Sequence, residues 1–341
     1  MPRRFFWTRL PDEELLKLRL RDLKVTVEGS PLERRMKDLR NELAKRKLMV
    51  EPRAWISDEW FSPDDAPGIA LPFYLAHPRL TRLERKMMID VEGGSVAECM
   101  RILRHETGHV IQNAFQLQRR RRWQQLFGAA SQRYPRYYRP NPSSRSFVQH
   151  LPLWYAQSHP AEDFAETFAV WLRPRSDWRR RYAGWPALKK LEYVDELMHE
   201  IAGQKPLVTS QRKVEPLRTL SMTLEAHYAR KQAAYAVDFP KTYDPDLTRI
   251  FASHDRHPDA PAASTFLRKN RARIRQAVSR WTGEHQLTLD SLMDEMIGRC
   301  RELKLRAVGS ERKLRMDFTV LLTAKTVHAI YSHSRRKWFA L

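Results

Sequence analysis

RHETGHV, at residues 104–110, places two histidines four positions apart within a helical pattern. Residues i and i+4 lie on the same helix face, so the imidazoles of His105 and His109 can converge on one metal ion. Glu106 lies about 100° around the helix from His105, where it can act as general base to a water on that metal without being a ligand. The stretch predicts a zinc site with two histidine ligands and a glutamate base. The alternative is a chance pair of solvated histidines on an ordinary helix.

The residues around this stretch favour one long helix. Gly93, Gly94 and Ser95 interrupt the chain, and a helical pattern follows to about Arg122. One side of the helix is predicted to pack and the opposite side to face a cleft. The packed stripe consists of Val96, Met100, Leu103, Thr107, Val110 and Ala114, and the other side carries Glu98, His105, His109 and Gln116.

A catalytic zinc site of this type needs a third protein ligand, and a second predicted helix can supply it. HPAEDFAETFA, at residues 159–169, carries Glu162 and Glu166 four positions apart on one face. Ala165 and Ala169 beside them would let this helix approach the histidine helix closely, while aromatic side chains opposite would anchor it in the core. We predict Glu162 as the third ligand and Glu166 as the group that holds a ligand histidine in its tautomer. The alternative is a pair of solvated glutamates that interact favourably with the helix dipole.

The two motifs together, HETGH at 105–109 and EDFAE at 162–166, resemble those of the gluzincin metallopeptidases. They are especially similar to the catalytic domain of anthrax lethal factor and to the bacterial zinc-binding metallopeptidases related to it. The resemblance is specific over the two helices and extends loosely over residues 1–202. It implies an α+β, zincin-like catalytic domain with a small sheet, and an enzyme that hydrolyses peptide bonds with Zn2+ as cofactor.

The resemblance also implies two further features of the site. In that family a tyrosine seven residues before the ligand glutamate assists the chemistry, and Tyr155 has this spacing from Glu162. Its hydroxyl could stabilise an oxyanion or protonate the leaving amine, although with 11 tyrosines in the chain a core or surface role is the alternative. A strand before the histidine helix, for which 68–74 is the candidate, would bind extended substrate or be an ordinary sheet strand. His159 and His77 are predicted to be structural.

The length of 341 residues and the change in texture along the chain predict two domains. Residues 31–47 form an amphipathic pattern that Ser30 can cap, whereas alternation at 23–27 and proline-broken runs at 50–80 favour short strands and turns. Helices are predicted at 160–172 and 185–202, and then at 217–236, 263–281, 287–305 and 311–331. The predicted domains are a metallopeptidase domain at 1–207 and a basic, mostly α-helical C-terminal domain at 208–341, which we expect to serve interactions.

The composition is typical of a folded protein, with 42% hydrophobic and 30% charged residues. No signal-peptide pattern is present, and no stretch approaches the roughly 18 apolar residues of a membrane span, so a cytoplasmic protein without a membrane span is expected. The two cysteines, Cys99 and Cys300, are predicted to be buried thiols.

The net charge of +22 is compatible with an acidic substrate, nucleic acid or an anionic membrane surface. Basic runs lie at 118–123, 173–182 and 266–280, but no known nucleic-acid module is matched. The predicted partner is a peptide or protein substrate, which the charge allows to be acidic; the oligomeric state is not predicted. The alternative function is a basic helical binding protein, for nucleic acid or an acidic protein, that keeps a structural zinc without turnover. Glu106 argues against it, since a structural site needs no base.

Overall fold

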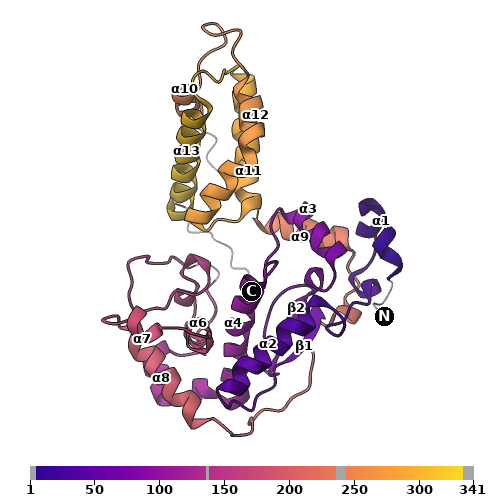
Figure 1. The fold of residues 1–341 in the computed structure, drawn as a ribbon, viewed down its shortest axis with the longest axis vertical. Coiled ribbons are helices and arrows are strands. Elements are labelled where there is room, and N and C mark those ends of the chain that lie inside the picture. Colours follow the sequence, from indigo (N-terminus) through magenta and orange to yellow (C-terminus); the bar gives the residue numbers. More distant parts are fainter. Residues whose placement is uncertain (1–4, 136–137, 236–242, 333–341) are drawn as a thin grey trace. The chain divides into compact units, whose positions relative to one another are not determined.

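The computed structural model describes residues 5–135, 138–235 and 243–332 (Figure 1). Over these ranges the chain is mostly helical with one two-stranded sheet, which confirms the α+β class in this coarse form. The described residues divide into two compact units, the first comprising 5–87, 91–135 and 138–227 and the second 88–90, 228–235 and 243–332. The boundary between these units differs from the boundary between the predicted domains, 1–207 and 208–341. The domain assignment stays a prediction. None of the described helices is both long and apolar enough to cross a membrane.

The first unit holds the motif helices and the sheet. Its α-helices and strands are α1 (Asp12–Leu16), α2 (Pro31–Lys45), β1 (Arg53–Ser57), β2 (Gly68–Pro72), α3 (Pro78–Met88) except its last residue, α4 (Val96–Phe115), α5 (Arg121–Phe127), α6 (Pro160–Leu172), α7 (Trp178–Arg181), α8 (Ala187–Glu200) and the start of α9 (Leu224–Tyr235). Its 3-10 helices are η1 (Phe6–Arg9), η2 (Leu20–Leu23), η3 (Phe73–Leu75), η4 (Leu117–Arg119), η5 (Pro152–Gln157) and η6 (Leu217–Thr219).

The sheet consists of β1 and β2 in parallel, in a register that runs from Arg53 opposite Gly68 to Ser57 opposite Pro72. On the other edge of β2, the Ala70 amide donates to the Phe61 carbonyl at 2.8 Å. The candidate substrate-binding edge at 68–74 is therefore occupied at this point.

The predicted strand at 23–27 does not form. Residues 20–23 are the 3-10 helix η2, and Lys24 has a left-handed backbone with φ of 50°. The alternating Leu23, Val25 and Val27 are buried all the same. The alternation therefore reflected burial of an irregular segment, which a two-residue period cannot distinguish from a strand.

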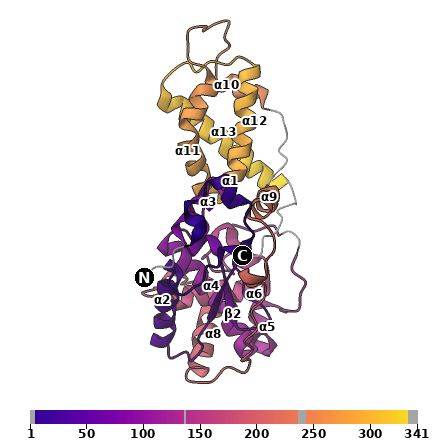
Figure 2. The same cartoon turned by 90° about the vertical axis from the view of Figure 1, so that its right-hand side faces the viewer.

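Helix α4, which carries the histidines, lies in the middle of the first unit, where it packs against α2, α6 and β2 (Figure 2). Ser95 caps it by accepting from the Glu98 amide. The predicted extension to Arg122 is wrong: the helix ends at Phe115 because Gln116 turns left-handed, with φ of 51°. On the predicted open side, Glu98, His109 and Gln116 are half-buried and His105 is buried, whereas the predicted packed stripe is buried apart from Val96, which is 57% exposed.

Helices α4 and α6 touch backbone to backbone at Gly108 and Ala165. A Cβ atom added to Gly108 would lie 2.6 Å from the Ala165 Cα and 3.1 Å from its Cβ. Small residues at both positions are therefore required for this approach, as predicted for Ala165. The contact lies between the two histidines of α4 and the two glutamates of α6, so it sets the distance between them.

We expect Gly108→Ala to destabilise the protein by about 1–3 kcal/mol, because the added methyl group forces two packed helices apart. Denaturant unfolding measures the change. Gly298→Ala is the matched control, since Gly298 also lies within a helix but its added Cβ meets nothing within 4 Å. That variant should be more stable than wild type by about 0.5–1 kcal/mol through helix propensity. Equal effects of the two substitutions would contradict the close-approach explanation.

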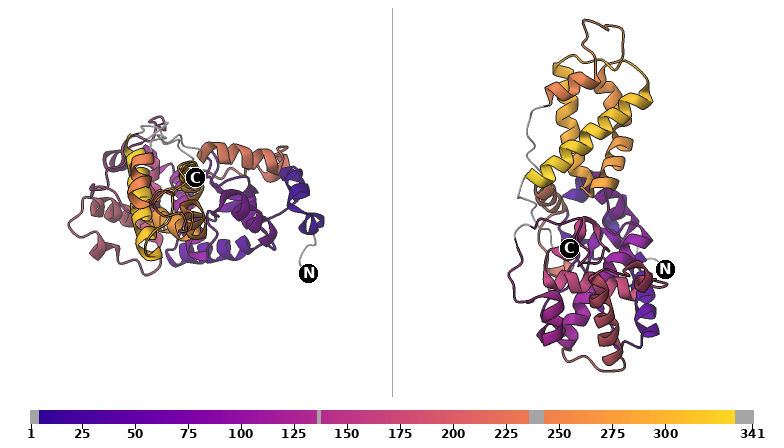
Figure 3. Two further views of the ribbon diagram at one scale, coloured as in Figure 1. Left: turned by 90° about the horizontal axis from the view of Figure 1, so that it is seen from above. Right: turned by 90° about the vertical axis from the view of Figure 1, so that its left-hand side faces the viewer.

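The second unit is helical, with the end of α9, α10 (Asp244–Ile250), α11 (Ala263–Thr282), α12 (Gln286–Glu302) and α13 (Glu311–Ser332). Helix α11 packs against α12 and α13 (Figure 3). These three helices agree with the predictions to within a few residues. The helix predicted at 217–236 begins instead at Leu224, and its predicted last residue, 236, lies outside the described residues. The core is apolar and includes Phe251, Leu267, Leu292, Met296 and Phe318. Cys99 and Cys300 are both buried, free thiols, as predicted.

Candidate metal centre

Three donor atoms converge between α4 and α6: Nε2 of His105, Nε2 of His109 and Oε2 of Glu162. The two Nε2 atoms are 3.2 Å apart, and the Glu162 oxygen lies 3.1 Å from that of His109 and 3.0 Å from that of His105. Ligands of a tetrahedral zinc at about 2.0–2.1 Å are themselves about 3.3 Å apart. Among residues 5–135, 138–235 and 243–332, these three side chains form the group of histidine, cysteine and acidic residues whose donor atoms lie close enough together to hold a metal ion. The two imidazole nitrogens and one carboxylate oxygen are a donor set that fits zinc.

The position of Glu162 follows from how α6 is held. His159 caps the helix, its Nδ1 accepting from the Ala161 amide at 3.2 Å. Asp163, the next residue along, points elsewhere and forms a buried ion pair with Lys190 of α8 at 2.5 Å. With Ala165 against Gly108, these contacts fix both the start and the rotation of α6. Glu162 therefore faces the histidines of α4 although it lies 53 residues beyond His109 in the sequence.

Glu166 lies one turn further along α6 and is fully buried. Its Oε1 accepts from His105 Nδ1 at 2.9 Å, and its Oε2 accepts from the Leu151 amide at 2.7 Å. When Nδ1 of His105 donates to this carboxylate, the lone pair of the neutral ring lies on Nε2, where a metal ion can bind it. Glu166 thus contacts His105, and its role in holding a ligand histidine in its tautomer stays a prediction.

The electrostatics of the group favour positive charge. Burial lowers the pKa of His105, but the hydrogen bonds with Glu162 and Glu166 outweigh it and raise that pKa to about 10. Burial likewise opposes a charge on Glu162, yet His109 and His105 hold the pKa of that carboxyl well below its usual value. A metal cation would interact with the same negatively charged glutamates, and bind the same histidine nitrogens, as the protons do. Metal binding therefore competes with protonation of the histidines.

Glu106 is 1% exposed, and neither oxygen of its carboxylate has a hydrogen-bond partner among the described residues. Burial raises the pKa of its carboxyl, and the charges of His105 and His109 offset part of that rise. A buried carboxylate without a partner costs free energy. The prediction that Glu106 acts as a general base is not tested by this burial and stays a prediction.

Tyr155 lies against His105, with ring centroids 5.4 Å apart in an edge-on arrangement. It belongs to η5, in which Leu153 and Trp154 both have positive φ angles, of 63° and 55°. This unusual turn places the tyrosine ring beside the histidine. A role for its hydroxyl in the reaction stays a prediction.

Tyr134 is the residue of the site that sequence reasoning missed. Its hydroxyl donates to Oε1 of Glu162 at 2.9 Å, and its ring stacks on His159 with centroids 3.8 Å apart. Burial and the charge of Glu162 raise the pKa of the phenol, so it remains a donor at neutral pH. In the sequence it is one tyrosine at the edge of a loop rich in proline, tyrosine and arginine, and no spacing signal singles it out.

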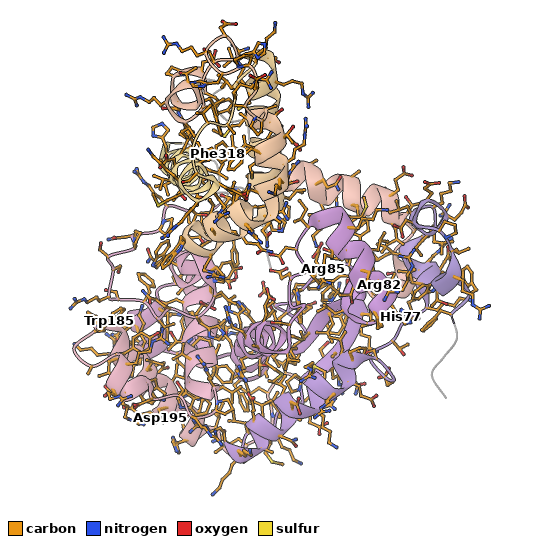
Figure 4. The ribbon with its side chains drawn as sticks, turned by 45° about the horizontal axis from the view of Figure 1, so that its top comes forward. His77, Arg82, Arg85, Trp185, Asp195 and Phe318 are labelled. Carbon is orange, nitrogen blue, oxygen red and sulfur yellow. The ribbon has the colours of Figure 1, made fainter. Side chains whose placement is uncertain are left out.

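The two histidines that the sequence predicted to be structural, His159 and His77, make local packing and capping contacts. His159 caps α6, as described above. His77 accepts from the Arg79 amide through Nδ1 and packs edge-on against Trp7. Figure 4 labels His77 and Arg82. Burial and the charge of Arg82 lower the pKa of His77. Neither histidine belongs to the group of converging metal donors.

Comparison with known protein families agrees with this centre. Residues 98–180 match a family model described as putative zinc-binding metallo-peptidase. The matched segment includes both glutamates of α6 and the His-Glu-x-x-His stretch of α4. No significant match was found among curated proteins or among solved structures. The match supports a zinc metallopeptidase family, and the structure adds a buried His-His-Glu group able to bind a metal.

Proposed function

We propose that this protein is a zinc-dependent metallopeptidase of the gluzincin type, with a zincin-like catalytic domain similar to that of anthrax lethal factor. The observation that carries the proposal is the buried, unpartnered carboxylate of Glu106 beside the three converging donors. A structural metal site would gain nothing from such a group. The family match over residues 98–180 points the same way.

In this proposal His105, His109 and Glu162 hold the zinc, and Glu166 keeps His105 in the tautomer that binds it. Zinc bound there would supply Lewis acidity, which makes water a better nucleophile and polarises a peptide carbonyl. Glu106 removes the proton from the attacking water and delivers it to the leaving amine. Tyr155 stabilises the developing oxyanion or assists the amine. Burial raises the pKa of the Glu106 carboxyl, which makes it a stronger base toward water than an exposed glutamate.

The second candidate function is a binding protein with a structural zinc and a nucleic acid or acidic protein partner. Structural zinc sites are closed by four protein ligands, whereas the group found within the described residues has three. Part of the basic surface is also neutralised locally, since Arg120 pairs with Glu200 and Arg122 with Glu196. Both observations favour the peptidase. An acidic peptide substrate and an interaction role for the second unit remain proposals.

The decisive experiment measures the zinc content of the purified full chain and its cleavage of an unbiased peptide library, before and after removal of metal. We expect one zinc per chain, cleavage that a chelator abolishes, and recovery of cleavage when zinc is restored. A protein that binds one zinc and unfolds on chelation, but cleaves nothing, would support the structural site instead. Cleavage that persists without metal would exclude the proposed mechanism.

A further inference from the structure

Glu162 and Glu166 of α6 both contact one segment, residues 128–151 between α5 and η5, through the carboxylate oxygen that does not face the histidines, which we call the outer oxygen. Each carboxylate directs one oxygen toward the histidines and the other toward this segment. For Glu166, the outer oxygen accepts from the Leu151 amide at 2.7 Å. For Glu162, the outer oxygen accepts from the Tyr134 hydroxyl at 2.9 Å. Only the second contact is made by a side chain, so it can be removed by mutation.

We propose that Tyr134 is a positioning residue of the metal centre, which holds the Glu162 carboxylate with Oε2 directed at His105 and His109. The proposal rests on the proposed function in one respect, namely that the centre binds zinc. A glutamate carboxylate rotates almost freely about its last bond. A hydrogen bond to the outer oxygen fixes that rotation and leaves the inner oxygen available to the metal.

The surroundings of Tyr134 support this role. Its ring stacks on the imidazole of His159, and that imidazole caps α6 through Nδ1 while its Nε2 contacts the Gln132 carbonyl at 3.0 Å. Tyr134 is thus tied to the helix that carries Glu162 and to its own segment at the same time. The tyrosine is nevertheless 43% exposed, so it contributes less to the core than a buried aromatic residue does.

The two tyrosines of the site have separate contacts. Tyr155 lies against the imidazole of His105, whereas Tyr134 bonds to the carboxylate of Glu162. Tyr155 is the residue assigned to the reaction by resemblance. Tyr134 is assigned here to the ligand, and its loss should therefore appear in metal affinity before any substrate is added.

The test is the zinc dissociation constant of Tyr134→Phe, measured by competition with a chromophoric chelator on the full chain. We expect zinc binding about 10–100-fold weaker than in wild type, the range typical when a group that orients a metal ligand is removed. Tyr138→Phe is the matched control, because Tyr138 lies in the same segment and donates to the Leu153 carbonyl at 2.9 Å. The control should bind zinc within about twofold of wild type.

Two further measurements separate positioning from a general loss of structure. The thermal unfolding of the zinc-free protein should be the same for wild type and Tyr134→Phe, and the cobalt-substituted variant should show a changed d–d spectrum. In a Glu162→Ala background, Tyr134→Phe should cause no additional loss of affinity, because the group it orients is absent.

Unchanged zinc affinity of Tyr134→Phe, or an equal loss in the Glu162→Ala background, would overturn the inference. In both cases a wild-type protein that binds zinc and cleaves peptides would leave the proposed function standing. A wild-type protein that binds no zinc would overturn the proposed function and this inference together.

Discussion

Glu106→Gln is expected to lower the rate constant of peptide hydrolysis about 10²–10⁴-fold, the usual contribution of a positioned general base. Glutamine keeps the size and shape of the side chain but cannot take a proton from water. The zinc content should equal that of wild type, because Glu106 is not among the three converging donors. Metal analysis and initial rates on the same peptide measure both effects.

For the same substitution, Glu106→Gln, we expect the stability of the protein to be maintained or increased although its activity falls. The Glu106 carboxylate is buried without a hydrogen-bond partner among the described residues, so replacing it with a neutral amide removes an unfavourable charge. We expect the free energy of unfolding of the zinc-free protein to be unchanged or higher. Glu98→Gln, in the first turn of the same helix, is the control and should retain activity. Loss of zinc together with loss of activity in Glu106→Gln would show that Glu106 acts on the metal and not as a base.

Glu162→Ala is expected to weaken zinc binding about 10²–10³-fold. Structural zinc sites bind with about 10–16 kcal/mol from four ligands, or roughly 2.5–4 kcal/mol for each. Glu162 supplies one of the three donors, at 3.0 and 3.1 Å from the two histidine nitrogens. Peptide cleavage should fall with the zinc content and recover in part at high zinc concentration. Chelator competition and titration of activity with zinc measure these changes.

Glu192→Ala is the control for this variant, since Glu192 is an exposed glutamate of α8 within the same unit. It should bind zinc as wild type does. The helix content of Glu162→Ala should also equal that of wild type, because alanine favours a helix. If Glu162→Ala binds zinc as tightly as wild type, Glu162 is not a zinc ligand, even though its carboxylate lies close to the histidines.

Local sequence patterns predicted several helices of this protein closely. Helix α6 begins and ends at the predicted residues, and Ser30 caps α2 as expected. Capping residues, prolines and the helical period act over a few neighbours, so the sequence contains their full cause. The predictions failed where the cause is not local. Alternation at residues 23–27 does not form a strand, because a strand also needs a partner to bond with.

The sequence by itself determined that His105 and His109 share a helix face and that Glu162 and Glu166 share another, because i,i+4 spacing fixes both. Only the tertiary structure decided that these faces meet, through the contact of Gly108 with Ala165. It also decided the burial of Glu106 and the bond from Tyr134 to Glu162. Those features depend on how closely two backbones approach and on where an irregular segment lies. Such distances arise from the packing of residues far apart in the chain, and no local spacing encodes them.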